Sequence, residues 1–301
     1  MKLKWQTIGA SIQGATHIKN GQPCQDACAI HTDNDFVVAA VADGHGSKSC
    51  PLSADGAEIA ANLICELLQA SINELHDMKN VMLPRRIEME WKKRVLEKHK
   101  SMSMLKTDEF DKDALGQQLL LDAIKDESPP PEECDCDIDE IAALEPPIED
   151  NDVYVLFGTT LLAVAICPDF AFALKIGDGD ILMINDCDEV TQVLATKENI
   201  GEDTESLCLK EAWRYIETQM IPAESLTNAS MFMLTTDGYR NSFTSRAGFH
   251  KAGTDILHIC RTEGIAYVES LLKEWLTATS QKGSGDDIAM AILLAGKSNE
   301  A

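Results

Sequence analysis

Three aspartates stand where an apolar run meets Gly or a second Asp: Asp43, Asp237 and Asp286. A strand end is a rigid mount for a carboxylate, and an adjacent Gly lets the backbone approach a ligand closely. Hard divalent cations such as Mg²⁺ and Mn²⁺ prefer oxygen ligands of this kind. Because several carboxylates without a cation would repel one another, the set predicts a metal site if the fold brings its members together.

Taken alone, each of these motifs is weak, because Asp-Gly is a common turn sequence. A fourth acidic motif, Gly177-Asp178-Gly179-Asp180, lies between two short apolar runs. By itself it indicates a tight hairpin turn. The interpretation as a site therefore depends on the motifs occurring together and in order.

Hydrophobic periodicity predicts the elements that would position these residues. Short apolar runs indicate strands at 36–42, 160–166, 170–176, 181–184, 231–236 and 288–294. Helical spacing of apolar residues indicates helices at 53–75, 84–100, 205–219 and 254–278, with Ser53 as an N-cap. Since strict βαβ alternation is missing, the pattern favours an α+β fold with largely antiparallel sheets and helices packed outside them.

The chain has 301 residues and a formal charge of −24. That charge argues against nucleic acid as a partner and against docking on anionic membranes, since both attract Lys and Arg. No run reaches about 18 apolar residues, so no membrane span is expected. The ten cysteines lack zinc-type spacing and, without an export signal, are simplest as free thiols in a reducing cytoplasm. We expect a cytoplasmic monomer with a single domain over residues 1–301.

Half of the negative charge comes from one segment. Residues 126–152 hold 12 acidic residues, no basic ones and five prolines. Such a composition cannot bury enough apolar surface to offset the cost of ordering, so we interpret it as a flexible acidic insert.

Six motifs follow one another along the chain: Gln25-Asp26, Asp43-Gly44-His45-Gly46, Gly158-Thr159-Thr160, Gly177-Asp178-Gly179-Asp180, Thr236-Asp237-Gly238 and Gly285-Asp286-Asp287-Ile288. In this order they resemble the metal-dependent, type 2C class of protein phosphatases, and more narrowly its compact bacterial branch. The resemblance covers most of the chain outside the acidic insert. It implies a four-layer αββα sandwich, in which two central, mainly antiparallel sheets are flanked by helices, with a two-metal centre at one edge.

The resemblance also implies the ligands of the first metal, Mn²⁺ or Mg²⁺. Asp43 should bridge both metals, and the Gly44 carbonyl should bind one of them. Asp237 and Asp286 should complete the protein ligands of the first metal.

Two further residues take roles by the same resemblance. Asp178 matches a position that helps to hold a third, weaker metal, and Asp26 matches a supporting acidic position near the second.

Two cations about 3.5–4 Å apart lower the pKa of a bridging water, whose hydroxide attacks phosphorus in line with the leaving serine or threonine oxygen. His45 is the candidate proton donor to that oxygen, because imidazole titrates near the working pH. The alternative is that His45 only hydrogen-bonds a metal-bound water.

The chain departs from the family pattern on one side of the site. Gln25 stands where the family usually has Glu, so we expect a weaker second-metal ligand unless another residue compensates. No Arg lies between residues 1 and 84, and His17 takes the spacing of the family's phosphate-binding Arg. His17 is either a phosphate ligand or a structural loop histidine, and Lys19 is the other candidate. Cys24 is either a redox-sensitive thiol or a small core residue.

The leading hypothesis is hydrolysis of phosphoserine and phosphothreonine in proteins, in opposition to a Ser/Thr kinase, with that kinase or its targets as partners. A second is a catalytically weakened module that keeps the fold for binding or regulation. A third is a phosphohydrolase that acts on a small molecule.

Overall fold

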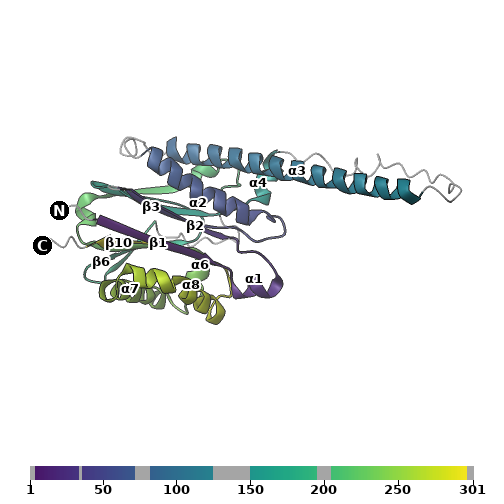
Figure 1. Ribbon diagram of the computed structural model, residues 1–301. Coiled ribbons are helices and arrows are strands. Elements are labelled where there is room, and N and C mark those ends of the chain that lie inside the picture. Colours follow the sequence, from purple (N-terminus) through teal and green to yellow (C-terminus); the bar gives the residue numbers. More distant parts are fainter. Residues whose placement is uncertain (1–3, 34–35, 72–81, 125–149, 195–204, 297–301) are drawn as a thin grey trace.

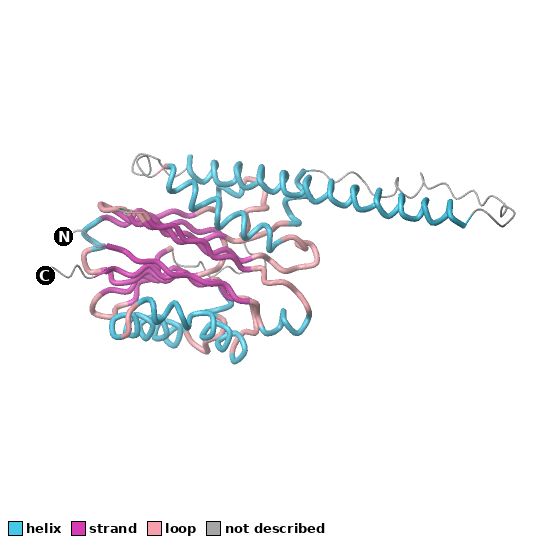
Figure 2. The backbone as a smooth tube through the Cα atoms, in the orientation of Figure 1, coloured by secondary structure: helices cyan, strands magenta, loops and turns pink. Residues whose placement is uncertain are grey.

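The computed structural model describes residues 4–33, 36–71, 82–124, 150–194 and 205–296. Two five-stranded antiparallel sheets lie face to face, and helices cover both outer faces (Figures 1 and 2). This arrangement confirms the four-layer α+β sandwich predicted from the sequence.

The first sheet has the strand order β2 (Asp26–Thr32), β3 (Val37–Asp43), β4 (Leu161–Ile166), β5 (Phe170–Ile176) and β8 (Glu217–Pro222). The second has the order β1 (Lys4–Ile12), β10 (Ile288–Gly296), β9 (Ala229–Thr235), β6 (Asp180–Asn185) and β7 (Val190–Val193). Strands from both ends of the chain pair in the second sheet, since β1 lies beside β10.

The first sheet is covered by α2 (Ser53–Ala70), α3 (Met82–Ile124) and α4 (Asp150–Leu156), and the second by α7 (Arg246–Thr262) and α8 (Ile265–Lys282). Short helical segments are α1 (Ala15–Asn20), η2 (Ala212–Arg214), α5 (Ala223–Leu226) and α6 (Asp237–Arg240). The helix predicted at 84–100 corresponds to α3, which is much longer and extends well past the end of the sandwich (Figure 1).

Alternating side chains of the strands build three stacked cores. On β3, Val38 and Ala40 face the α2–α3 layer, while Val37 and Ala39 face the second sheet. On β10, Ala289, Ala291 and Leu293 face the first sheet. The other face of β10 packs on α7 and α8 through Ile288, Met290 and Ile292. Because both sheets are buried on both faces, the residues at their edges are held on a rigid frame.

Two of the predicted helices are wrong. The only helical turn in residues 205–219 is η2, and their last three residues begin β8, which pairs with β5. Glu211 just before η2 has a left-handed backbone (φ 54°), which stops a helix, and pairing along the sheet edge overrides the helical pattern. The helix predicted at 254–278 is two helices, because Gly264 between α7 and α8 has φ +90°.

The hairpin predicted at Gly177-Asp178-Gly179-Asp180 is also wrong. β5 and β6 belong to different sheets, so this motif carries the chain across the sandwich. Gly177 has φ +98°, and a Cβ at Gly179 would lie 2.6 Å from the Thr235 carbonyl. Both glycines serve this close crossing, which brings Asp178 to the edge where β3 and β9 end.

Most of the acidic insert predicted at 126–152 lies outside the described residues, and its last three residues begin α4. Ser53 is not an N-cap but the first residue of α2, and its Oγ lies 3.4 Å from the Gly46 N–H. Within the described ranges, no helix is both long and apolar enough to cross a bilayer.

Candidate functional site

Two of the predicted acidic residues meet at one end of the first sheet. Asp26 begins β2 and Asp43 ends β3, and the register of these antiparallel strands places them directly opposite each other. Like charges in opposed positions destabilise a sheet. The pair therefore requires a proton or a cation to offset the repulsion.

The backbone of Asp43 is fixed by the loop that precedes β4. Its N–H donates to Thr160 Oγ1 (2.9 Å), and its carbonyl accepts from the Thr160 N–H (2.8 Å) and from Thr159 Oγ1 (2.9 Å). Gly44 then forms an isolated bridge with Thr159. The Gly158-Thr159-Thr160 motif thus positions Asp43.

Asp237 reaches Asp43 from the second sheet, where it follows β9 and begins α6. The carboxyl groups of Asp43 and Asp237 lie within interaction distance of each other. Burial, with the neighbouring carboxylates, raises the pKa of Asp43 well above its usual range and also raises the pKa of Asp237. Asn241 Nδ2 donates to Asp237 Oδ2 (2.8 Å) and orients that side chain.

Asp26, Asp43 and Asp237 form a cluster of carboxyl groups. Asp26 is the most buried of the three, with 7% of its surface exposed. Its pKa is raised well above the usual range, mainly by burial and further by the charges of Asp287 and Asp286. Thr236 Oγ1 opposes this shift by donating to Asp26 Oδ2 (2.6 Å), while the same hydroxyl accepts from the Ala289 N–H (2.9 Å). A single threonine therefore ties Asp26 to both strands of the second sheet nearest the site.

The fit of this donor set to divalent cations depends on how its carboxyl groups are arranged. Among the described residues, no three His, Cys, Asp or Glu side chains already form a closed metal cage. The raised pKa values of Asp26, Asp43 and Asp237 nevertheless indicate a cation site, because these carboxyl groups face one another without positive charge. Because the carboxyl groups of Asp43 and Asp237 approach each other this closely, their raised pKa values are the better indicator of a cation site. The all-oxygen set fits Mg²⁺ or Mn²⁺.

A cavity of about 220 Å³ opens beside the cluster. Its lining residues are His17, Gln25, Asp26, Asp43, Gly44, His45, Gly46, Asp286 and Asp287. The predicted phosphate ligand, the predicted proton donor and most of the predicted metal ligands therefore share one polar space. Asp178 and Asp237 are not among these lining residues, but the charge of Asp178 contributes to raising the pKa of Asp43 and of Asp237.

His45 is anchored beside the cavity. Its N–H donates to the Gly158 carbonyl (3.1 Å), and its Cδ2 lies 2.7 Å from the point that a Cβ on Gly158 would occupy. Only a glycine therefore leaves room for the ring there. Burial lowers the pKa of His45, and the charge of Asp178 opposes that shift. A dianionic phosphate would act in the same direction as Asp178 and favour the protonated ring.

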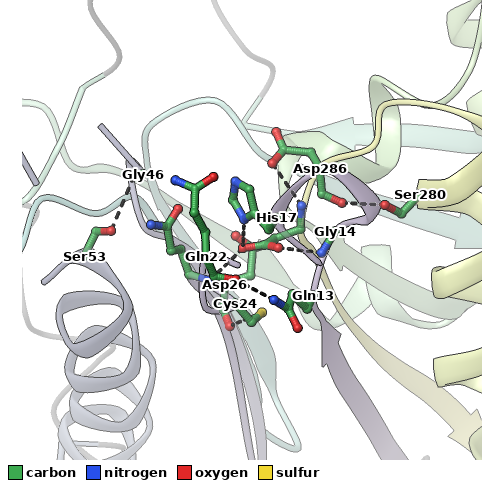
Figure 3. A network of polar contacts seen from close by, with 12 residues as sticks. Gln13, Gly14, His17, Gln22, Cys24, Asp26, Gly46, Ser53, Ser280 and Asp286 are labelled. Atoms are coloured by element: carbon green, nitrogen blue, oxygen red, sulfur yellow. Dashed lines mark hydrogen bonds and ion pairs between the residues drawn. The ribbon is translucent and has the colours of Figure 1, made fainter. Parts of the chain in front are cut away.

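Asp287, which lines the cavity, joins the N-terminal segment to the start of β10. Its Oδ1 accepts from the Gly14 N–H (2.6 Å) and its Oδ2 from the Gln25 N–H (2.6 Å), while His17 Nδ1 lies 2.8 Å from Oδ2. Figure 3 shows His17 and Gly14 within this network of polar contacts. Ser280 Oγ supports the same turn by donating to the Asp286 carbonyl (2.8 Å).

The family model described as protein phosphatase 2C matches residues 13–277. The chain belongs to the protein phosphatase 2C family. Among solved structures, a bacterial serine phosphatase matches with a TM-score of 0.56 at 10% identity, covering 99% of each chain. The S. agalactiae serine/threonine phosphatase matches with a TM-score of 0.53 at 14% identity, covering 97% of this chain and 100% of that one. No match was found among curated proteins.

Two residues that depart from the phosphatase 2C pattern do line the cavity. Gln25 is buried, and its Oε1 packs so closely on Gly46 that a Cβ there would collide with it. Gly46 also has φ +59°, so both its conformation and its neighbour favour glycine. His17 reaches the cavity from α1, but its Nδ1 faces Asp287.

Two supporting residues of this phosphatase 2C site were missed from the sequence. Asp287 was quoted only as part of a motif, although its carboxylate is 4% exposed and satisfied by backbone donors. Ser206 Oγ accepts from the Thr159 N–H and donates to its carbonyl (both 3.1 Å). No local pattern marks either residue, since their partners lie 47 or more positions away in the sequence.

Partial burial argues against a redox-sensitive role for Cys24. Its Sγ donates to the Asp26 carbonyl (3.5 Å). Burial, helped by the charge of Asp287, raises the pKa of this thiol to about 12. A thiol with so little thiolate at neutral pH is a poor nucleophile.

Proposed function

We propose that this chain hydrolyses phosphoserine and phosphothreonine in proteins, using Mn²⁺ or Mg²⁺ as cofactor. The observation that carries the proposal is the set of facing carboxyl groups of Asp26, Asp43 and Asp237 at the strand ends of a phosphatase 2C fold. Their raised pKa values mark a place where positive charge is needed. The polar cavity beside them has room for a phosphate group.

Each acidic residue has a proposed share in holding the cations. Asp43 and the Gly44 carbonyl would bind cations at the centre of the site. Asp237 and Asp286 would complete the ligands of the first cation, and Asp26 would support the second. Asp178 would serve a third, weaker position together with Asp237. Bound cations would supply an activated water and positive charge for the phosphoryl oxygens.

The chain's own residues provide orientation and proton transfer. The proposed proton donor is a ring nitrogen of His45, which would protonate the leaving serine or threonine oxygen. His17 has Nδ1 facing Asp287, so Nε2 is the nitrogen that would donate to a phosphate oxygen. Gln25 would offer its amide oxygen to the second cation, with weaker attraction than the Glu of the family.

The test is release of phosphate from a phosphothreonine peptide with and without Mn²⁺, alongside p-nitrophenyl phosphate. Turnover of the peptide that depends on Mn²⁺ supports the proposal. A folded protein that turns over neither compound would support a binding or regulatory module instead. Turnover of the aryl phosphate alone would favour a small-molecule phosphohydrolase.

A further inference from the structure

Two thiols lie close together beside Gly158. Cys50 lies in the turn before α2, and Cys208 lies in a run of turns before η2. Their Sγ atoms are 3.2 and 3.3 Å from the point that a Cβ on Gly158 would occupy. The two sulfur atoms are therefore separated by no more than the sum of these distances, although they are 158 positions apart in the sequence.

Neither thiol is in a disulfide, and they differ in access to solvent. Cys50 is 6% exposed, whereas Cys208 is half-buried. Burial raises the pKa of Cys208, though less than that of Cys24, and the adjacent Cys50 raises it further. Ser206 Oγ, 3.2 Å from Cys208 Sγ, opposes this shift because a hydroxyl can stabilise a thiolate. Cys208 is thus the thiol that an external reagent meets first, with Cys50 placed to react second.

We propose that Cys50 and Cys208 form a reversible disulfide by exchange with a small disulfide such as oxidised glutathione. The Cys208 thiolate attacks one glutathione sulfur, forms a mixed disulfide and releases one glutathione thiolate. The Cys50 thiolate then attacks the Cys208 sulfur and releases the second glutathione thiolate. The two released thiolates take up the two protons that the cysteines lose. Two protein thiols are oxidised, and one glutathione disulfide is reduced to two thiols.

This bond would form next to the proposed proton donor. His45 Cδ2 packs on the same Gly158 position as both sulfurs. The segment that carries Cys208 also positions Thr159, because the Leu207 N–H and Ser206 Oγ both donate to the Thr159 carbonyl (3.0 and 3.1 Å). Thr159 Oγ1 in turn donates to the Asp43 carbonyl. A disulfide requires the sulfurs to approach to about 2.05 Å. That movement displaces the loop that carries His45 relative to the segment that carries Ser206.

The experiment uses the full chain, reduced and then incubated with oxidised glutathione. Non-reducing peptide mass spectrometry is expected to find a Cys50–Cys208 link. Turnover of the phosphothreonine peptide should fall about tenfold or more, as expected for a misplaced catalytic group, and return with dithiothreitol. The loss of turnover rests on the proposed function, whereas the cross-link does not. If the reduced protein has no activity, the mass spectrum alone decides whether the disulfide forms.

Matched variants separate this pair from the other thiols. C208S and C50A should each remain active after the same treatment, while C187S, which changes an exposed cysteine elsewhere, should stay sensitive. Absence of a Cys50–Cys208 peptide overturns the proposal. So does inhibition of C208S equal to that of the unmodified chain, because another thiol would then be responsible.

Discussion

Asp26 and Asp287 are both buried carboxyl groups that line one cavity, yet their surroundings are opposite. Asp287 accepts two backbone hydrogen bonds of 2.6 Å and lies against His17. Asp26 has one hydroxyl donor, Thr236, and otherwise faces the carboxyl groups of Asp43 and Asp237. A buried carboxylate satisfied by the protein serves the fold, whereas one left without positive charge indicates a missing ligand.

The two regions also differ in how they are mounted. The facing carboxyl groups project from the ends of β2, β3 and β9 in two packed sheets. Asp287 instead gathers the loop around Gly14 and Gln25 against the start of β10. We therefore expect mutations in the first region to affect catalysis and mutations in the second to affect stability.

The largest expected effect is that of D43N. We expect phosphopeptide turnover to fall by more than about 10²-fold, because a preorganised charge at the reacting centre is removed. Without added cation, the free energy of unfolding should stay the same or increase, since one of the repelling carboxyl groups is gone. Steady-state kinetics and denaturant unfolding measure the two quantities. Near-normal turnover would remove Asp43 from the site.

D287N should mainly lower the free energy of unfolding, whereas D43N should mainly lower turnover. An amide cannot accept both backbone N–H groups as well as a carboxylate, and charge-assisted hydrogen bonds contribute about 1.5–3 kcal/mol each. We expect the free energy of unfolding to drop by about 3 kcal/mol in guanidinium titrations. The control is D286N at the neighbouring exposed position, where the change should stay within about 0.5 kcal/mol. Equal losses for the two variants would contradict the comparison.

The first region could be predicted from the sequence, and the second could not. Asp43 and Asp237 follow apolar runs whose strand character is local, so their place at strand ends is readable. That they face each other depends on the order of six motifs and on the family fold that this order indicates. Asp287 differs because its partners, Gly14 and Gln25, are more than 260 positions away and contribute only backbone atoms.

The errors in the predicted elements have the same cause. Gly177-Asp178-Gly179-Asp180 has the composition of a hairpin turn, but the packing of two sheets sends β5 and β6 to different layers. Residues 205–219 have helical spacing, but the edge of β5 and the contacts of Ser206 with Thr159 determine their structure. Local pattern identifies the chemistry of a residue more reliably than its long-range partners.

Q25E tests the boundary between the two regions at a smaller scale. The added carboxylate would face the cavity beside Gly46, where a cation is expected. We expect the Mn²⁺ concentration for half-maximal activity to fall about tenfold, equivalent to about 1.4 kcal/mol of binding free energy. Isothermal titration with Mn²⁺ checks the same shift without turnover. An unchanged metal dependence would show that Gln25 does not contact the cation.

The smallest expected effect is that of H17A, which decides to which region His17 belongs. His17 lines the cavity, but its Nδ1 lies 2.8 Å from Asp287 Oδ2. If Nε2 binds phosphate, KM for the phosphopeptide should rise about fivefold with kcat unchanged, the loss of about one hydrogen bond. H17Q, which keeps a side-chain donor, should recover part of that loss. A lower melting temperature with unchanged KM would instead assign His17 to Asp287 and the fold, and Lys19 would then be the remaining N-terminal candidate for the role of the family's arginine.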